Sequence, residues 1–348
     1  MTPSASGDKQ NQPRGRVRLS DVARRAGVGT SVASRVLNAD PTVSVRLETR
    51  ERILEAARSL SYTPNAFARG LKTARTMTLG LVLSNLAYAV NAEIIRGAVR
   101  QAAREGYVVL VADAEEFEEA GDAYNRLLLE RRVDGLLIAS ATRGRAIDGL
   151  PSQPLPFVLV NRREEALGVS VSLDDAAGTT LAVEHLVALR HNLIAHVGGP
   201  PDADTARRRL AGFKHGMTAA GIPASPACIV QAPFSERGGY DAGKRLLAAS
   251  PRPTAIVAAS LASAIGVIAA SRSLGLRVPD DVSVVGFHDA PVAAYLNPPL
   301  TTVRMPLGEM AEVAVDALAQ LIEGISVSNI VISTPPELVE RDSTAPLL

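Results

Sequence analysis

Four residues within one short segment carry side chains suited to reading DNA: Thr30, Ser31, Ser34 and Arg35. Small hydroxylated side chains let a helix approach base edges closely, and an arginine can donate two hydrogen bonds to a guanine. A structural helical hairpin without a ligand is the alternative interpretation. Residues 1–75 hold 14 Lys and Arg against 6 Asp and Glu, a net charge of +8, and this charge favours the nucleic-acid interpretation.

The spacing around these residues predicts a helix-turn-helix. Ser20 is a suitable N-cap for a first helix with Asp21 in its first turn, and Gly27 is expected to end that helix. A second helix is expected over Thr30 to Leu37, with Asn38 at its exit. In this geometry the N-terminal residues of the second helix lie against base edges in the major groove.

A third helix is expected to begin at a cap on Ser44 and to stop before Pro64. Its apolar residues recur at helical spacing, namely Leu47, Ile53, Leu54, Ala57 and Leu60. A further short helix is expected from Pro64 to Lys72, but Gly70 makes it marginal when isolated. The sequence therefore predicts a small helical domain followed by a weakly helical segment.

From Thr78 onward, short apolar runs alternate with helical patterns, which is typical of parallel sheets covered on both faces. We expect strands at 78–83, 107–112, 134–139, 157–160, 193–198, 255–259 and 282–287. We expect helices at 92–105, 118–132, 175–189, 205–220, 236–249 and 261–274. A body of this length favours two sheets with a cleft between them.

Composition excludes several classes of protein. Hydrophobic residues make up 47% and charged residues 21%, as in ordinary globular proteins, so neither a disordered nor a fibrous chain is expected. Cys228 is the single cysteine, which excludes a disulfide scaffold. The uncharged run 253–271 is interpreted as a strand and a helix and not as a membrane span. The N-terminus lacks the pattern of a secretory signal, so a cytoplasmic protein is expected.

Catalytic and metal-binding patterns are weak. The chain has no phosphate-binding glycine loop and no nucleophile elbow, so an enzyme is the less favoured interpretation and no cofactor is expected. Three histidines, His185, His191 and His196, lie close in sequence. They are expected in a helix, at the end of that helix and in a strand, so they are not expected to converge on a metal ion. Ordinary cap or core roles are therefore favoured over metal ligation. The acidic run 115–119 is interpreted as a solvated loop and helix start.

The chain resembles the lac repressor and galactose repressor family of bacterial transcription factors. In the first part of the chain the resemblance rests on SDVARRAGVGTSVASRVLNADPTVS, TRERILEAARSLSYTPNAFARGLKT and TMTLGLVLSN. It continues through RRVDGLLIAS, VNRR, SLDDAAGTTLAVEHL, RRRLAGF, LGLRVPDDVSVVGF and AAYLNPPLTTV, and so covers nearly the whole chain.

The resemblance implies a multidomain protein, with an all-α helix-turn-helix headpiece and an α/β core of two subdomains like periplasmic binding proteins (type I), built on parallel sheets. The expected parts are a disordered arm (1–16), the DNA-binding domain (17–63), a hinge helix and linker (64–76) and an effector-binding and dimerisation core (77–348). A homodimer is expected on double-stranded operator DNA, because two-fold symmetry doubles the bases that one recognition helix reads.

The resemblance also implies functional residues. The expected DNA contacts come from Ser20, Thr30, Ser31, Ser34, Arg35, Asn38, Tyr62, Asn65, Ala68 and Leu71, with Leu71 as a wedge in the minor groove. The expected effector contacts come from Val90, Asn91, Thr205, Arg209, Phe234, Ser260 and His288.

The expected effector site departs from the family pattern. His288 stands where sugar-binding members usually carry Asp, Ser260-Leu261 stands in place of Asn-Asp, and Arg190 replaces a usual glycine. Because these changes remove carboxylates while Arg209 remains, an anionic metabolite held by that arginine becomes the expected alternative to a sugar. A member that has drifted and responds weakly or not at all is the other interpretation.

Three functions are therefore weighed: a transcription regulator, most often a repressor, controlled by a small molecule; a soluble or periplasmic small-molecule binding protein; and an enzyme. The basic N-terminal segment and the helix-turn-helix pattern favour the first.

Overall fold

The computed structural model describes residues 17–38, 40, 42–62, 75–84, 86, 88, 90–113, 132–139, 155–164 and 167–347. The chain divides into two compact units, residues 1–75 and residues 76–348. The expected arm (1–16), the hinge helix with Asn65, Ala68 and Leu71, the acidic run and the helix expected at 118–132 fall wholly or almost wholly outside the described residues.

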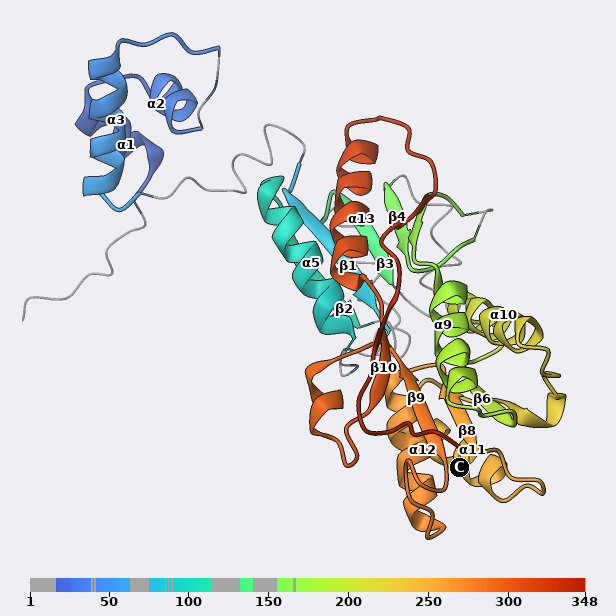
Figure 1. Cartoon of the computed structure of the whole chain (residues 1–348). Helices are drawn as coiled ribbons and strands as arrows, with labels where there is room; N and C mark the ends of the chain where they lie inside the picture. Colours follow the sequence, from blue (N-terminus) through green and yellow to red (C-terminus); the bar gives the residue numbers. More distant parts are fainter. Residues whose placement is uncertain are drawn as a thin grey trace, which may run out of the picture. The chain divides into compact units, whose positions relative to one another are not determined.

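The described residues of the first unit form three helices around a small apolar core. They are α1 (Leu19–Ala26), α2 (Thr30–Leu37) and α3 (Leu47–Ser59) (Figure 1). Gly27 ends α1 in the left-handed conformation with φ 67°, where a residue without Cβ carries no strain. The core is built from Val22, Ala23, Ala26, Ala33, Val36, Ile53, Ala56 and Ala57.

Two predicted caps in this unit are wrong. Ser20 lies inside α1, because the helix begins earlier and the Asp21 carboxylate accepts a hydrogen bond from the backbone N–H of Arg18 at 2.9 Å. Ser44 does not cap α3, whose N-cap is Arg46. Val43 and Val45 pack against the headpiece core, which keeps the chain before α3 in an irregular loop.

The apolar stripe predicted for α3 is only partly buried. Ile53 and Ala57 lie in the core, whereas Leu47 is 70% exposed and Leu54 is 41% exposed. These two leucines fall on the outer face because α3 is short and covers the core with a narrow stripe.

The described residues of the second unit form two six-stranded sheets. The first has the order β11-β5-β4-β3-β1-β2, and its neighbouring strands all pair in parallel. The second has the order β12-β10-β9-β8-β6-β7 and is parallel except for β12, which is antiparallel to β10. Strands β1–β5 are Thr78–Leu83, Val108–Asp113, Gly135–Ala139, Phe157–Val160 and Ser170–Ser172. Strands β6–β12 are Ile194–Gly198, Ile229–Gln231, Ala255–Ala258, Ser283–Phe287, Thr301–Arg304, Ile330–Val331 and Glu337–Val339.

Helices pack against each sheet and define two subdomains. In the N-terminal subdomain α5 (Asn91–Arg104) and α13 (Leu307–Ile322) contact the first sheet and each other (Figure 1). The C-terminal subdomain contains α9 (Asp175–Ala188), α10 (Asp204–Ala219), α11 (Glu236–Leu247) and α12 (Leu261–Ser273), with short 3₁₀ turns at Pro226–Cys228 and Pro291–Tyr295. Because α13 follows β10 of the second sheet but packs on the first, the chain runs between the subdomains more than once.

The alternation predicted from the sequence is confirmed for the described elements, with bounds that shift by one or two residues. The run 253–271 forms β8 and most of α12, and no helix among the described residues is long and apolar enough to cross a membrane. The sequence analysis assigned no element after Phe287 and so missed α13, whose apolar residues nevertheless recur at helical spacing.

Candidate functional site

The first candidate surface is the outward face of α2 in the headpiece. Thr30 and Ser31 are exposed in its first turn, while Ala33 and Val36 face the core. Asn38 is exposed at the end of the helix and its amide donates to the backbone carbonyl of Ser34 at 2.8 Å. The helix therefore presents short polar side chains at its N-terminal end, where a recognition helix contacts bases.

Arg35 has partners within the headpiece. Its Nε–H donates to Asp40 at 2.9 Å and its Nη2 donates to the hydroxyl of Thr42 at 2.7 Å. Hydrogen bonds from Thr42 and from Arg35 hold the pKa of the Asp40 carboxyl well below its usual range. The guanidinium thus links α2 to Asp40 and Thr42 through Nε and Nη2.

Other predicted DNA contacts lie elsewhere on the headpiece. Ser20 is exposed on α1, and Tyr62 is half-buried and packs against the headpiece core.

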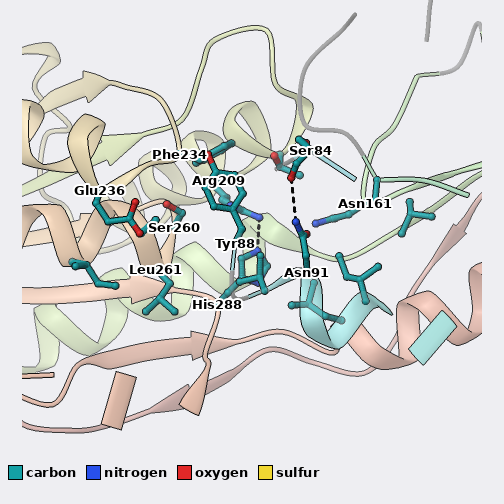
Figure 2. Close-up of a pocket in the computed structure, with 18 of the residues that line it drawn as sticks. Ser84, Tyr88, Asn91, Asn161, Arg209, Phe234, Glu236, Ser260, Leu261 and His288 are labelled. Carbon is teal, nitrogen blue, oxygen red and sulfur yellow. Dashed lines mark hydrogen bonds between the residues drawn. The ribbon is translucent and has the colours of Figure 1, made fainter. Parts of the chain in front are cut away.

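The second candidate site is a cavity of about 320 Å³ between the two sheets of the core (Figure 2). This volume is within the range of small-molecule sites, roughly 300–1,000 Å³. All seven predicted effector residues line it: Val90, Asn91, Thr205, Arg209, Phe234, Ser260 and His288. The carboxyl ends of parallel strands converge at the cavity, since Ser84 follows β1, Asn161 follows β4 and His288 follows β9.

Arg209 is the buried cation of this cavity, with its side chain 4% exposed. Its Nε–H donates to Asp175 at 2.7 Å, its Nη1 donates to the carbonyl of Ala259 at 2.6 Å, and its Nη2 lies 2.8 Å from Nε2 of His288. The centre of the guanidinium lies 4.2 Å from the ring centroid of Phe287 and 5.5 Å from that of Phe234. Salt bridge, hydrogen bonds and aromatic faces together fix the orientation of Arg209.

The state of His288 follows from this contact. A guanidinium only donates hydrogen bonds, so Nε2 of His288 accepts and the ring proton lies on Nδ1. Burial and then the charge of Arg209 hold the pKa of His288 well below its usual range. His288 is therefore a neutral imidazole, and its buried Nδ1–H has no acceptor among the described residues.

Asp175 is the functional residue that the sequence analysis missed. Its carboxylate is fully buried and forms ion pairs with both Arg209 and Arg208. From the sequence Asp175 was expected only to start a helix, and carboxylates of the site were sought at the positions of His288 and of Ser260-Leu261. The pattern SLDDAAG carries two adjacent carboxylates before a helix, and the sequence does not show that the second one turns inward.

Arg208 extends this ionic cluster from one subdomain to the other. Its Nε–H donates to Asp204 at 2.9 Å, and its Nη2 lies 3.2 Å from both the carbonyl and the amide oxygen of Asn161. The backbone N–H of Arg163 donates to the same Asp204 at 3.0 Å. The start of α10 is therefore tied to the end of β4 in the other subdomain.

The histidines near α9 hold ordinary structural contacts. Nε2 of His185 lies 3.0 Å from the hydroxyl of Thr344. Nδ1 of His191 lies 3.0 Å from the hydroxyl of Thr254, and its Nε2 lies 3.1 Å from the hydroxyl of Ser283. Nδ1 of His196 lies 3.0 Å from the carbonyl of Val257. No group of three or more potential metal ligands occurs within the described ranges.

Comparison with known proteins gives matches to both units of the chain. Residues 18–65 match the family described as bacterial regulatory proteins, lacI family, and residues 183–344 match the periplasmic binding protein-like domain. The HTH-type transcriptional repressor PurR of Erwinia tasmaniensis is 34% identical over 331 residues, covering 94% of this chain and 96% of that protein. The ribose operon repressor of Escherichia coli is 32% identical over 328 residues, covering 93% and 99%.

Solved structures of transcription regulators are also similar to this chain over nearly its whole length. The lac repressor dimer bound to operator and the anti-inducer ONPF matches with a TM-score of 0.81 and 31% identity, covering 94% of this chain and 99% of that one. The CelR regulator in complex with cellobiose matches with a TM-score of 0.71 and 29% identity, covering 94% and 100%.

A helix-turn-helix unit joined to a two-subdomain core with a ligand-sized cleft defines an effector-controlled, DNA-binding transcription regulator. The chain belongs to the LacI family of bacterial regulatory proteins.

Proposed function

We propose that this regulator represses transcription by placing α2 of each protomer of a homodimer in the major groove of a pseudo-palindromic operator. The base edges are contacted by Thr30, Ser31, Ser34 and Arg35. The sugar-phosphate backbone of the DNA is contacted by Ser20 and Asn38. The single observation that carries this proposal is the exposed polar N-terminal turn of α2 on a headpiece with a net charge of +8 over residues 1–75.

The core cavity controls that binding. The relatives include a repressor of the ribose operon and a regulator crystallised with cellobiose, which supports a small metabolite as the effector of this chain. The seven predicted effector residues come from both subdomains, so an occupant contacts both at once. The hinge residues Asn65, Ala68 and Leu71 then transmit the change in the core to the DNA, which Tyr62 of the headpiece also contacts, in the cytoplasm where operators lie.

The chain is proposed to act by binding and not by catalysis, because its relatives are repressors and its buried ionisable residues pair with each other. A small-molecule binding protein without DNA function is the second candidate, favoured by the core alone. The match of residues 18–65 to the lacI family counts against it.

The test is selection of bound duplexes from a random DNA library, followed by a gel shift with the selected site. A two-fold symmetric site bound by two chains is the expected result. Recovery of no preferred sequence by the full chain would favour the small-molecule binding protein.

A further inference from the structure

The charges around the effector cavity are already balanced without a ligand. Among the described residues that line it, the charged side chains are Arg209 and Glu236. Asp175 forms an ion pair with Arg209 at 2.7 Å and is itself fully buried, and His288 is neutral. Glu236 is exposed in the first turn of α11 and is shown in Figure 2 beside Ser260.

This arrangement overturns the reason for expecting an anionic effector. That expectation held that His288 in place of Asp, and Ser260-Leu261 in place of Asn-Asp, remove negative charge from the cavity while Arg209 remains. The structure supplies the counter-charge from α9, on Asp175. An anion entering the cavity would therefore lose its hydration next to a cation that is already paired, and Glu236 would repel it.

The same cavity has an apolar wall. Leu261 and Ile265 on α12, together with Val292, line it from the C-terminal subdomain, and Ile94 and Leu307 line it from the N-terminal subdomain. Ser260 uses its hydroxyl at the start of α12, where it accepts from the backbone N–H of Ser263 at 3.0 Å and donates to the Ser263 hydroxyl at 2.8 Å. A ligand with hydroxyls on every face would leave several of them without partners against this wall.

The polar end of the cavity offers hydrogen-bond donors. Three of the five N–H bonds of Arg209 are used by Asp175, Ala259 and His288, and the other two have no partner among the described residues. The Nδ1–H of His288 also has no acceptor in that part of the chain. A hydrogen-bond acceptor on the effector is thus the group that complements this end.

We infer that Asp175 sets the charge class of the effector, and that the cavity selects an uncharged molecule with an apolar body and a hydrogen-bond acceptor at one end. This inference rests on the proposed effector control of the core. Asp175 contacts Arg209 and Arg208 and does not line the cavity, so it is a positioning residue whose charge determines which ligands Arg209 attracts.

Benzamide and benzoate test the inference, because they share an apolar ring and differ in the charge of one acceptor group. Binding of each to the full chain is measured by titration calorimetry or, for weak binding, by ligand-observed NMR. The parent is expected to bind benzamide about tenfold or more tightly than benzoate. In Asp175→Asn the ratio of the two dissociation constants should shift toward benzoate by about tenfold or more, because Arg209 loses its counter-charge.

The matched control is Asp202→Asn, which changes net charge by the same amount at an exposed position just before α10. It should keep the ratio of the parent. Equal or tighter binding of benzoate by the parent, an unchanged ratio in a folded Asp175→Asn protein, or binding of neither probe to the parent would each overturn the inference. If Asp175→Asn does not fold, the ratio of the benzamide and benzoate dissociation constants of the parent is the test of the inference. A gel shift with the selected operator is run on the same protein preparations without benzamide or benzoate. Operator binding there shows that a failure of the inference about the effector is not a failure of the proposed DNA binding.

Discussion

His196 should make the stability of the core depend on pH. Its side chain is fully buried on β6, stacked on Phe213 with ring centroids 4.9 Å apart, and burial lowers its pKa to about 4. In the unfolded chain the pKa of a histidine is near 6.5. Between these values the unfolded state binds the proton and the folded state does not, so acid stabilises the unfolded state.

The size of this effect follows from the difference between the two pKa values. Above pH 6.5 the ring is neutral in both states and the free energy of unfolding is unaffected. As the pH falls from 6.5 toward 4, His196 alone should lower the free energy of unfolding by about 3 kcal/mol, at 1.36 kcal/mol per pKa unit. Between pH 7.5 and pH 5.0 the loss should be about 2 kcal/mol.

The measurement compares the parent with His196→Gln by urea unfolding at pH 7.5 and pH 5.0. Because the chain has no tryptophan, circular dichroism is the signal. The glutamine amide can still donate to Val257 but does not titrate. The variant should therefore lose about 2 kcal/mol less between the two pH values than the parent. His215→Gln, at an exposed position on α10, is the control and should behave like the parent. An equal loss in His196→Gln and the parent would refute the reasoning.

Further predictions concern DNA and effector binding. Arg35→Ala should weaken binding to the selected operator by about 1–3 kcal/mol in a gel shift, and an equal loss on random duplex would exclude a base contact. Operator affinity should fall by orders of magnitude between about 50 and 200 mM salt, and a flat response would contradict phosphate contacts. Leu71→Ala should reduce both the bending of the operator, measured by a circular-permutation gel shift, and the affinity for it. Bending equal to that of the parent would show that Leu71 is not a wedge in the minor groove. Gly199→Ala places a Cβ against the ring of Phe234 and should weaken benzamide binding while operator binding is retained; unchanged benzamide binding would show that this ring does not shape the cavity.

The helices of the headpiece and the alternating core could be predicted because their signals are local. The bounds of α2 follow from Gly29 before it and Asn38 after it, and the buried apolar strands follow from continuous runs such as Thr78–Leu83. The predicted N-caps at Ser20 and Ser44 were wrong by two residues, because helix ends depend on local backbone geometry: the N-caps are Arg18 and Arg46, and neither makes a side-chain capping hydrogen bond.

The sequence by itself determined the class of protein and seven of the residues that line the core cavity, because the motifs that carry the family resemblance are contiguous. Only the tertiary structure decided how those residues are charged and paired. Arg209 and Asp175 are 34 positions apart, and Arg209 and His288 are 79 apart. Their contact depends on how α9, α10 and β9 pack, and no local pattern reports which buried carboxylate faces which cation. For that reason the negative charge of the site was sought at positions 288 and 260–261, whereas the fold provides it from Asp175.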